Sequence, residues 1–273
     1  MSRPSVLVTG ATGKTGRRVA DRLTRLGHPV RQASRRGEQP FDWARPETWS
    51  AALRGTDVAY LCYFPDLAAP QAPDVVEAFT AAARKAGVYR LVLLSGRGEA
   101  GARRCEAIVA GSGLGYTIVR ASWFAQNFTE GQLAQAVHDG LLALPAGQVA
   151  EPFVDVDDVA DVAVAALTDD RHDGRAYEVT GPRLLTFDQA AAEIAEATGR
   201  EVRYLPVTAE QFHDGLVGQV GPDHARLLTD LCVEVFDGRN ASLGDGVQQA
   251  LDRQPADFTD VCRQAAAART WQR

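Results

Sequence analysis

The sequence predicts an α/β fold in which a parallel β-sheet is covered by helices on both faces. Three observations lead to this prediction. Short apolar runs alternate with helix-like stretches through the first half of the chain. The first of these runs ends in a glycine-rich turn, and helical stretches dominate after about residue 124. We therefore expect a Rossmann-type, doubly wound core with a smaller, mainly helical C-terminal part that binds substrate, and a ligand cleft between them.

The first half of the chain contains six apolar runs with the length and β-branched content of buried strands. They cover residues 5–9, 30–34, 40–43, 57–62, 90–95 and 116–120. Apolar residues recur at helical spacing between these runs, and glycines such as Gly27 end the pattern. Helices are accordingly predicted at residues 13–26, 47–53, 73–86 and 99–110. These elements define a dinucleotide-binding Rossmann core over residues 1–123.

The second half is mainly helical. Helices are predicted at residues 132–139, 157–167, 187–198, 209–217, 223–236 and 256–268, and short strands at 153–156, 176–180 and 202–205. Asp157 and Asp158 are interpreted as the cap and first-turn acids of one of these helices. Residues 124–273 are therefore expected to be a mixed region that returns to the core at about 153–180 and then forms the C-terminal substrate-binding lobe.

Length and charge limit the classes of partner. The chain has 273 residues, of which 45% are hydrophobic and 23% charged, as is usual for a globular protein. Its 29 basic and 35 acidic residues give a net charge of −6, which excludes a polycation that coats nucleic acid. The longest uncharged run, residues 107–119, is too short to span a bilayer. We expect no nucleic-acid partner and no membrane partner, and the sequence does not indicate an oligomeric state.

The four cysteines, Cys62, Cys105, Cys232 and Cys262, are scattered along the chain. No two of them form a C-x-x-C motif, and no histidines cluster beside them, so neither a disulfide framework nor a zinc site is expected. Four free thiols fit a reducing compartment, and we predict a cytoplasmic protein without a metal ion.

The glycine turn carries the clearest binding signal. Gly10, Gly13 and Gly16 lie between a predicted strand and a predicted helix at the N-terminus. In such a motif the first glycine allows the tight turn, the second lets the backbone approach a pyrophosphate, and the third allows close packing of helix and strand. The neighbouring Gly-Lys-Thr sequence is not a nucleoside-triphosphate loop, because Val8 occupies the position where that loop needs a glycine.

The end of the second strand determines the expected cofactor. An NAD site places a carboxylate there, whereas this chain has Ser34-Arg35-Arg36 and no acid before Glu38. Guanidinium groups bind a 2′-phosphate through charge-assisted hydrogen bonds, so NADP(H) is the predicted cofactor. The predicted cofactor contacts are Gly10, Thr12, Gly13, Lys14, Thr15, Gly16, Ser34, Arg35, Arg36, Leu61, Cys62, Tyr63, Ser95 and Gly96.

Several further motifs resemble one family. Besides the glycine turn and Ser34-Arg35-Arg36, they are residues 92–96 (VLLSG), 116–120 (YTIVR), 123–128 (WFAQNF), 153–160 (FVDVDDVA) and 177–182 (YEVTGP). Together they resemble the NmrA-like group of atypical short-chain dehydrogenases/reductases over nearly the whole chain. The resemblance implies an NADPH-dependent reductase or a regulator that binds the dinucleotide without turning it over. Some members, such as the simocyclinone ketoreductase of an actinomycete antibiotic pathway, reduce flat aromatic polyketides.

The usual catalytic pair of the superfamily, Tyr-x-x-x-Lys, is absent. The only lysines are Lys14 and Lys85, and neither follows a tyrosine by four residues. Ser95, at the end of the fifth apolar run, remains from the usual catalytic set, and we assign it a positioning role only. Hydride transfer is chemistry of the cofactor, so the missing proton is expected to come from the substrate or from water.

Aromatic side chains follow the fourth and sixth apolar runs, where strand ends face the crevice in this fold. The predicted substrate contacts are Tyr63, Phe64, Trp123, Phe124, Asn127, Phe128 and His213. They favour a ketoreductase that acts on a flat aromatic or quinone-type carbonyl in secondary metabolism. The alternatives are a non-catalytic NADP-binding regulator or redox sensor and, less favoured, an epimerase-like enzyme that retains its NADP.

Overall fold

The computed structural model describes residues 3–37 and 40–271. Within these residues, six parallel strands form one sheet in the order β2–β1–β3–β4–β5–β8. The strands are β1 (Val6–Thr9), β2 (Val30–Ala33), β3 (Val58–Leu61), β4 (Arg90–Gly96), β5 (Gly115–Ala121) and β8 (Arg175–Val179). The sequence order reverses at β1, and the neighbouring strands β1 and β3 flank the switch point where ligands bind in such sheets.

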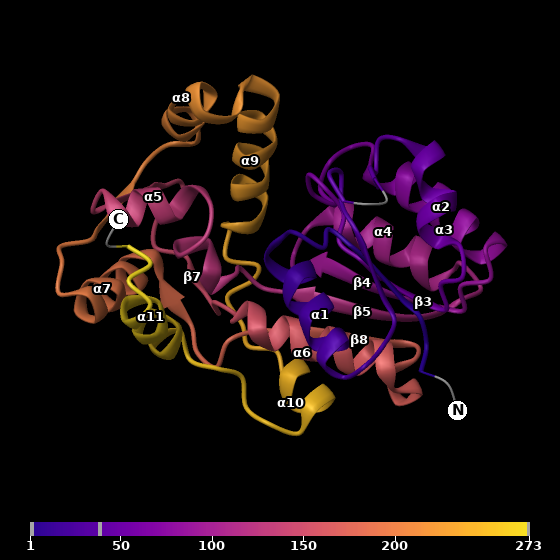
Figure 1. Ribbon diagram of the computed structural model, residues 1–273. Coiled ribbons are helices and arrows are strands. Elements are labelled where there is room, and N and C mark those ends of the chain that lie inside the picture. The colour runs from indigo at the N-terminus through magenta and orange to yellow at the C-terminus, as the bar shows by residue number, and fades with distance from the viewer. Residues whose placement is uncertain (1–2, 38–39, 272–273) are drawn as a thin grey trace.

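Helices cover both faces of this sheet (Figure 1), which confirms the predicted doubly wound α/β fold. On one face, α1 (Lys14–Arg25), α6 (Val156–Thr168) and α10 (Gly246–Leu251) bury apolar side chains against the strands. On the other face, the corresponding helices are α2 (Trp49–Leu53), which follows the 3₁₀ turn η1 (Pro46–Thr48), α3 (Ala72–Lys85) and α4 (Ala100–Ala110). The central strands β1 and β3 are buried throughout, as expected for a parallel sheet covered on both sides.

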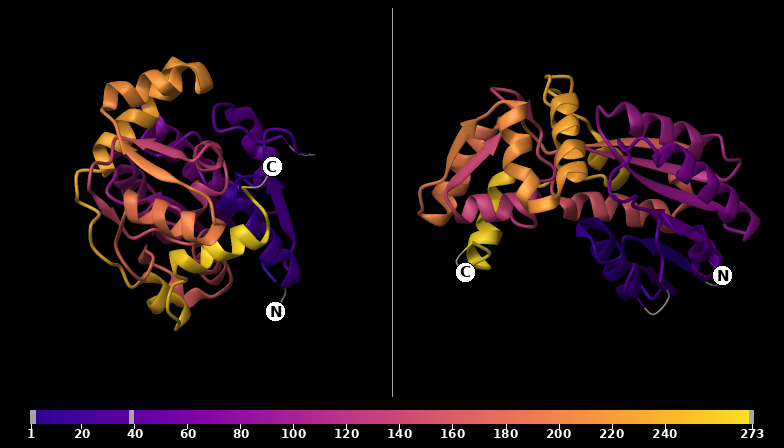
Figure 2. Two further views of the ribbon diagram at one scale, coloured as in Figure 1. Left: turned by 90° about the vertical axis from the view of Figure 1, so that its left-hand side faces the viewer. Right: turned by 90° about the horizontal axis from the view of Figure 1, so that it is seen from above.

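The second half of the chain builds a separate lobe with its own apolar core. Figure 1 and Figure 2 show this lobe beside the sheet, with α8 and α9 standing above the rest of the molecule. Two small sheets belong to it, the parallel pair β6–β10 and the antiparallel pair β7–β9. Its elements are η2 (Ala125–Phe128), α5 (Gln132–His138), β6 (Leu141–Leu144), β7 (Ala150–Glu151), β9 (Leu185–Thr186), α7 (Phe187–Thr198), β10 (Arg203–Pro206), α8 (Ala209–Val220), α9 (Pro222–Val235) and α11 (Phe258–Ala267).

The chain crosses between core and lobe several times. After η2, α5, β6 and β7 in the lobe, it returns to the core through α6, the 3₁₀ turn η3 (Asp170–His172) and β8, which pairs with β5. It then forms α7 to α9 in the lobe, returns once more as α10, and ends with α11 against α7. The boundary at residue 123 remains an interpretation of the sequence.

Two predicted strands are wrong. Residues 40–43 form only an isolated bridge between Ser34 and Pro40, and their aromatic side chains turn inward to pack beside α3. Residues 153–156 likewise form one bridge, between Phe124 and Val154. There the strand gives way to helix because the Asp155 side chain accepts a hydrogen bond from the backbone of Asp157 and caps α6. Asp157 and Asp158 are therefore first-turn acids, and Asp155 is the cap.

Candidate functional site

The glycine turn has the geometry that a pyrophosphate requires. Gly10 has a positive φ of 62°, which side chains rarely tolerate, and its carbonyl accepts a hydrogen bond of 2.8 Å from the Gly13 N–H. A Cβ on Gly16 would lie 2.2 Å from that carbonyl oxygen, so only glycine fits there. No side chain caps α1 at Gly13, and its first turn carries no acid. The N–H groups and dipole of α1 are thus available to an anion.

The basic pair at the end of β2 is free of acidic partners in the described part of the chain. The Arg35 guanidinium lies 4.6 Å from the centre of the Phe64 ring, and Arg36 is exposed. No carboxylate described by the structure forms an ion pair with either arginine; Glu38 lies outside the described residues. Two unpaired guanidinium groups beside the glycine turn suit a 2′-phosphate, so the residues present fit NADP(H).

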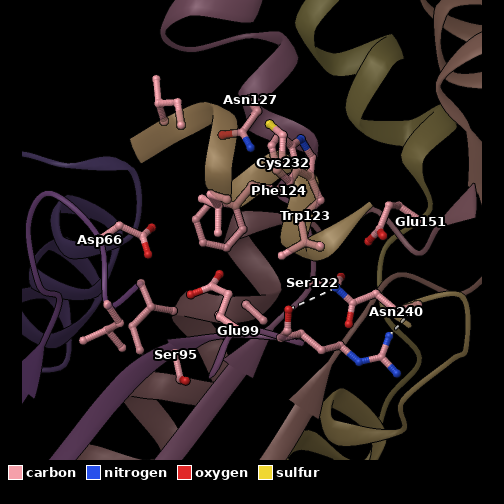
Figure 3. A pocket seen from close by; sticks show the side chains of 18 of the residues that line it. Asp66, Ser95, Glu99, Ser122, Trp123, Phe124, Asn127, Glu151, Cys232 and Asn240 are labelled. Carbon is pink, nitrogen blue, oxygen red and sulfur yellow. Dashed lines mark hydrogen bonds between the residues drawn. The ribbon is translucent and has the colours of Figure 1, made fainter. Parts of the chain in front are cut away.

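A cavity of about 410 Å³ opens at the carboxyl ends of the strands, between the core and the lobe. Of the predicted cofactor contacts, Lys14, Cys62, Tyr63, Ser95 and Gly96 line it. Of the predicted substrate contacts, Tyr63, Trp123, Phe124 and Asn127 line it. The aromatic side chains Trp123 and Phe124 face the same space as Asn127 in Figure 3. The cavity therefore reaches from the glycine turn to an aromatic wall.

Three predicted substrate contacts lie elsewhere. Phe128 is 1% exposed and packs against Phe153 in the core of the lobe, because η2 turns its ring inward. Phe64 is 52% exposed and faces Arg35. His213 lies on α8 with its Nδ1 3.2 Å from Asp214, whereas its neighbour Phe212 lines the cavity. We therefore no longer expect Phe128, Phe64 or His213 to touch a substrate.

The other predicted cofactor contacts lie along the turn and the adjacent strand ends. Thr12 is exposed in the turn, and the Thr15 hydroxyl contacts the Cys62 sulfur at 3.9 Å. The Ser34 carbonyl accepts a hydrogen bond from the Phe41 N–H. Leu61 is fully buried in the core, so its side chain cannot reach a ligand.

Lys14 joins the glycine turn to the lobe. Its Nζ donates a hydrogen bond of 2.5 Å to the Asn127 Oδ1. Burial lowers the pKa of Lys14, and the nearby Glu130 opposes that shift. Glu130 in turn pairs with Arg17 at 2.6 Å and with Arg18 at 3.0 Å. The cofactor end of the cavity is thus held by cations with acidic partners.

Ser95 belongs to the floor of the cavity. Its hydroxyl donates a hydrogen bond of 2.7 Å to the Glu106 Oε1, and in Figure 3 it points away from the aromatic wall. Glu106 also pairs with Arg120, which pairs with Glu178. Because its hydroxyl is used in this buried ionic network, Ser95 is not placed to hold a carbonyl in the cavity. The structure thus corrects the catalytic positioning role that the sequence suggested.

The network continues to the loop between α9 and α10. Arg97 pairs with Glu178 at 3.0 Å and donates hydrogen bonds to the Asn240 and Ser242 carbonyl oxygens. The Asn240 amide returns a hydrogen bond to the Arg97 carbonyl, and this contact is dashed in Figure 3. The floor and the loop behind it are therefore fixed to each other.

Four acidic side chains that the sequence analysis did not predict line the cavity: Glu130, which pairs with arginines as described above, and Asp66, Glu99 and Glu151. Burial, and then the neighbouring Asp66, raise the pKa of Glu99 well above its usual range. Burial raises the pKa of Asp66 as well. Glu151 is 1% exposed, and burial raises its pKa to about 7 against the opposing charge of Arg97.

A signal for two of these acids was present. Asp66 and Glu99 follow the adjacent strands β3 and β4, and the ends of those strands were already expected to face the crevice. They are neither aromatic nor part of a Tyr-x-x-x-Lys motif, so the two patterns that carried the sequence prediction do not contain them.

This fold and this site define a dinucleotide-binding α/β protein with a substrate cavity beside the cofactor turn. Residues 10–170 match the NAD(P)H-binding family, and the chain belongs to it. The chain is 33% identical to a (4-alkanoyl-5-oxo-2,5-dihydrofuran-3-yl)methyl phosphate reductase of Streptomyces griseus, over 96% of this chain and 98% of the relative. It is 31% identical to an NAD(P)H azoreductase of Xenophilus azovorans, with the same coverage.

A similar solved structure is the NADPH-dependent quinone oxidoreductase of Escherichia coli in complex with NADPH. It is 21% identical, covers 95% of this chain and 99% of that chain, and has a TM-score of 0.80. The expected NmrA-like, atypical short-chain dehydrogenase fold is confirmed, and the family match confirms a dinucleotide cofactor of the NAD(P)H type. The preference for NADP(H) over NAD(H) stays a prediction. The chain is an NAD(P)H-dependent oxidoreductase. No helix among the described residues is long and apolar enough to cross a membrane.

Proposed function

We propose that the protein is an NADPH-dependent reductase, a ketoreductase in the broad sense, of a flat aromatic or quinone-type carbonyl. The observation that carries this proposal is the cavity itself, which extends from Lys14 at the glycine turn to the rings of Trp123 and Phe124. An apolar slot of about 410 Å³ has the size of a small-molecule site. Flat rings gain most from aromatic walls of this kind.

Different residues would bind the cofactor and orient the acceptor in such a reduction. The backbone of the glycine turn and the N-terminus of α1 would hold the pyrophosphate, and Arg35 and Arg36 the 2′-phosphate. NADPH supplies the hydride when it is bound. The aromatic wall would orient the acceptor and exclude water from the site. The sequence contains no Tyr-x-x-x-Lys motif, so the proton that completes the reduction is expected to come from the substrate or from water.

The relatives support a reductase that acts on a small molecule. The Xenophilus protein is an azoreductase, and the Streptomyces protein reduces an oxo-dihydrofuran phosphate. A role in secondary metabolism and a cytoplasmic location are parts of the proposal. They rest on the resemblance to antibiotic-pathway ketoreductases and on the four free cysteines of the described chain.

The direct test is NADPH oxidation against a panel of quinones and polycyclic aryl ketones. We expect turnover of at least one acceptor. Cys232 lines the cavity, and the next residue of α9, Val233, is 55% exposed. Cys232→Phe should therefore abolish turnover by filling the slot while NADPH still binds, and the matched Val233→Phe should behave like the wild type.

Two outcomes would favour the alternatives. NADPH binding without turnover of any acceptor would indicate the non-catalytic regulator. Retention of bound NADP through a reaction without net oxidation of NADPH would indicate the epimerase-like enzyme. Equal effects of Cys232→Phe and Val233→Phe on turnover would contradict the placement of the substrate in this cavity.

A further inference from the structure

Glu99 occupies a special position at the end of β4. Its carboxyl group folds back over Gly96, the last residue of the strand, and a Cβ on Gly96 would lie 1.8 Å from the Glu99 Oε1. The absence of a side chain at Gly96 is therefore what admits the carboxyl group. The carboxyl ends of the strands face the ligand crevice, so Glu99 lies in the wall of the cavity although it is only 8% exposed.

Asp66 lies opposite Glu99 across the same part of the cavity. The two carboxyl groups point toward each other in Figure 3, and burial and then the neighbouring Asp66 raise the pKa of Glu99. Two facing carboxyl groups can form a hydrogen bond with each other only when one of them carries a proton. Asp66 also accepts a hydrogen bond of 2.8 Å from the Ala68 N–H, which favours Asp66 as the ionised partner and leaves the proton on Glu99.

The surroundings keep that proton in place. Glu106 of α4 and Glu234 of α9 add negative charge near Glu99, and Glu234 also faces Asp66. Within residues 3–37 and 40–271, no arginine, lysine or histidine forms an ion pair with Asp66 or Glu99. Glu99 is buried and Asp66 is partly buried, so ionising both would place two negative charges side by side without a cation, which favours a pair that retains one proton.

A second observation indicates that a ligand in the cavity has polar atoms that form hydrogen bonds with its wall. Glu151 of β7 lies on another wall, is 1% exposed, and has no hydrogen-bond partner for its Oε1 in the described structure. In Figure 3 its carboxyl group points toward the space between Glu99 and Trp123. A buried polar atom without a partner is costly unless a ligand or water satisfies it.

We propose that Glu99 is the proton donor of the reduction and that Asp66 is the positioning residue that holds its proton. The proposal rests on the proposed carbonyl or quinone reduction. In this proposal the proton comes from a side chain of the protein and not from the substrate or water. The absence of a side chain at Gly96 then serves to make space for the Glu99 carboxyl group.

Bound NADPH would supply the hydride, whose C–H bond on the nicotinamide breaks as a new C–H bond forms at the acceptor carbon, or an O–H bond at one quinone oxygen. The π electron pair of the acceptor then moves to the carbonyl oxygen, or to the second quinone oxygen, which must be protonated. The O–H bond of Glu99 breaks, and its proton forms the O–H bond of the product. The Glu99 carboxylate that remains is protonated again from solvent, and Asp66, which is more exposed than Glu99, lies on that path. The dinucleotide is oxidised and the acceptor reduced.

Glu99 is preferred to Glu151 because it lies beside two of the predicted cofactor contacts. Ser95 and Gly96 were assigned to the cofactor, and Glu99 lies directly over Gly96. Glu151 lies farther into the lobe, within the field of Arg97, which favours its ionised form.

The first experiment compares two acceptors in the full-length protein with NADPH. Menadione needs a hydride and a proton, whereas the N-methylacridinium cation needs only a hydride. Glu99→Gln should lower kcat for menadione by about 10²-fold or more and change the acridinium rate by less than about threefold. Exposed Glu77→Gln on α3 is the control and should match the wild type with both acceptors.

Three results would overturn the proposal. They are an unchanged menadione rate in Glu99→Gln, equal losses with both acceptors, and a selective menadione loss in Glu151→Gln with Glu99→Gln unaffected. A wild-type protein that oxidises NADPH with neither acceptor nor any of the quinone panel would count against the proposed function instead.

The second experiment separates positioning from chemistry. In Asp66→Asn the negative neighbour of Glu99 is removed, so the pKa of Glu99 should fall. The menadione rate requires protonated Glu99 and decreases as the pH rises through that pKa. The decrease should therefore occur at lower pH in Asp66→Asn, with the rate at low pH retained. An unshifted pH profile would remove Asp66 from the mechanism.

The third measurement does not depend on turnover. Infrared difference spectra at pH 7 between the wild type and Glu99→Gln should show the C=O band of one protonated carboxylic acid that the variant lacks. Its frequency should shift in Asp66→Asn, because its hydrogen-bond partner changes from a carboxylate to an amide. Absence of the band in the wild type would show that Glu99 is ionised and would overturn the proposal even in a protein without a known substrate.

Discussion

The cofactor end and the substrate end of the cavity are built from different groups. At the cofactor end the contacts are backbone N–H groups, Lys14 and two arginines, and the partly buried Lys14 lies beside Asn127 and Glu130. At the substrate end the polar groups are the carboxyl groups of Glu99, Asp66 and Glu151, set among aromatic rings. One end presents positive charge to a polyanion, and the other presents acids to a mostly apolar space.

Burial acts on both ends in the same way, because it penalises whichever form is charged. It lowers the pKa of Lys14, and Glu130 counters that effect. It raises the pKa of Glu99, and its acidic neighbours increase the effect. Burial is the largest cause of the pKa shift in both groups, and the neighbouring charges oppose it at Lys14 and reinforce it at Glu99. Substitutions at the two ends should therefore affect different functions, dinucleotide binding at one end and proton retention at the other.

The largest effect is expected at Gly16. Gly16→Ala would place a Cβ 2.2 Å from the Gly10 carbonyl oxygen, which is backbone and cannot move aside. The start of α1 would shift and the pyrophosphate site with it, so NADPH affinity measured by calorimetry should fall by at least about 10²-fold. Gly218→Ala on α8 is the control, because its Cβ would meet nothing within 4 Å. Normal NADPH binding by Gly16→Ala would contradict the assignment of the turn.

The next effect concerns cofactor choice. Each lost charge-assisted hydrogen bond is worth about 1.5–3 kcal/mol, or about 10- to 100-fold in affinity, so the double substitution Arg35→Ala, Arg36→Ala should weaken NADPH binding by at least about 10- to 100-fold. NADH has no 2′-phosphate, so its affinity should hardly change. Exposed Arg25→Ala on α1, which also removes a surface guanidinium group, serves as the control. An equal loss for both dinucleotides in calorimetric titration would refute a 2′-phosphate site at these arginines.

A smaller effect should appear in stability against pH at the substrate end. The pKa of Glu151 lies at about 7 in the fold, above its ordinary 4.5, so the fold favours the neutral acid. Stability from this group is complete below about pH 4.5 and is lost as the pH rises through 7. The free energy of unfolding of Glu151→Gln relative to wild type should therefore increase by about 2 kcal/mol between pH 5 and pH 8. Denaturant melts of both proteins, with Glu77→Gln as control, would reveal a pH-independent difference if the assignment is wrong.

The smallest effect is expected at Ser95. Its hydroxyl is used by Glu106, so Ser95→Ala should lower turnover by well under 10²-fold and cost about 1 kcal/mol of stability. Ser112→Ala removes a comparable 2.7 Å hydrogen bond far from the cavity, and it should cost similar stability without any kinetic effect. Complete loss of activity in a folded, NADPH-binding Ser95→Ala protein would make the hydroxyl a catalytic group.

The cofactor end could be predicted from sequence because its signals are local. Gly10, Gly13 and Gly16 lie within one turn, and the apolar runs of β1 and β3 predict buried parallel strands. Residues 40–43 were mistaken for a strand because an apolar run shows burial but not pairing, and Phe41 and Trp43 are buried without a neighbouring strand beyond one bridge.

The substrate end could be predicted only in part because its groups come from distant segments. Tyr63 and Trp123 were found by the rule that strand ends face the crevice, but the same rule was not applied to acids such as Asp66 and Glu99. No local pattern distinguishes Glu151, which lies in a two-residue strand that the sequence analysis missed. Phe128 was assigned to the substrate because aromatic content alone cannot tell a ring that faces a ligand from one that fills a core.

The repeated crossing of the chain between core and lobe has a consequence for synthesis on the ribosome. The strand β8 pairs with β5 only after α5, β6, β7 and α6 have been made, and α10 covers the sheet later still. The strand β5 therefore keeps an unpaired edge until β8 has emerged, and the nascent core stays incomplete until Leu251 has emerged. Core and lobe must consequently mature together, and a chain released early would present an open sheet edge to other nascent chains and to chaperones.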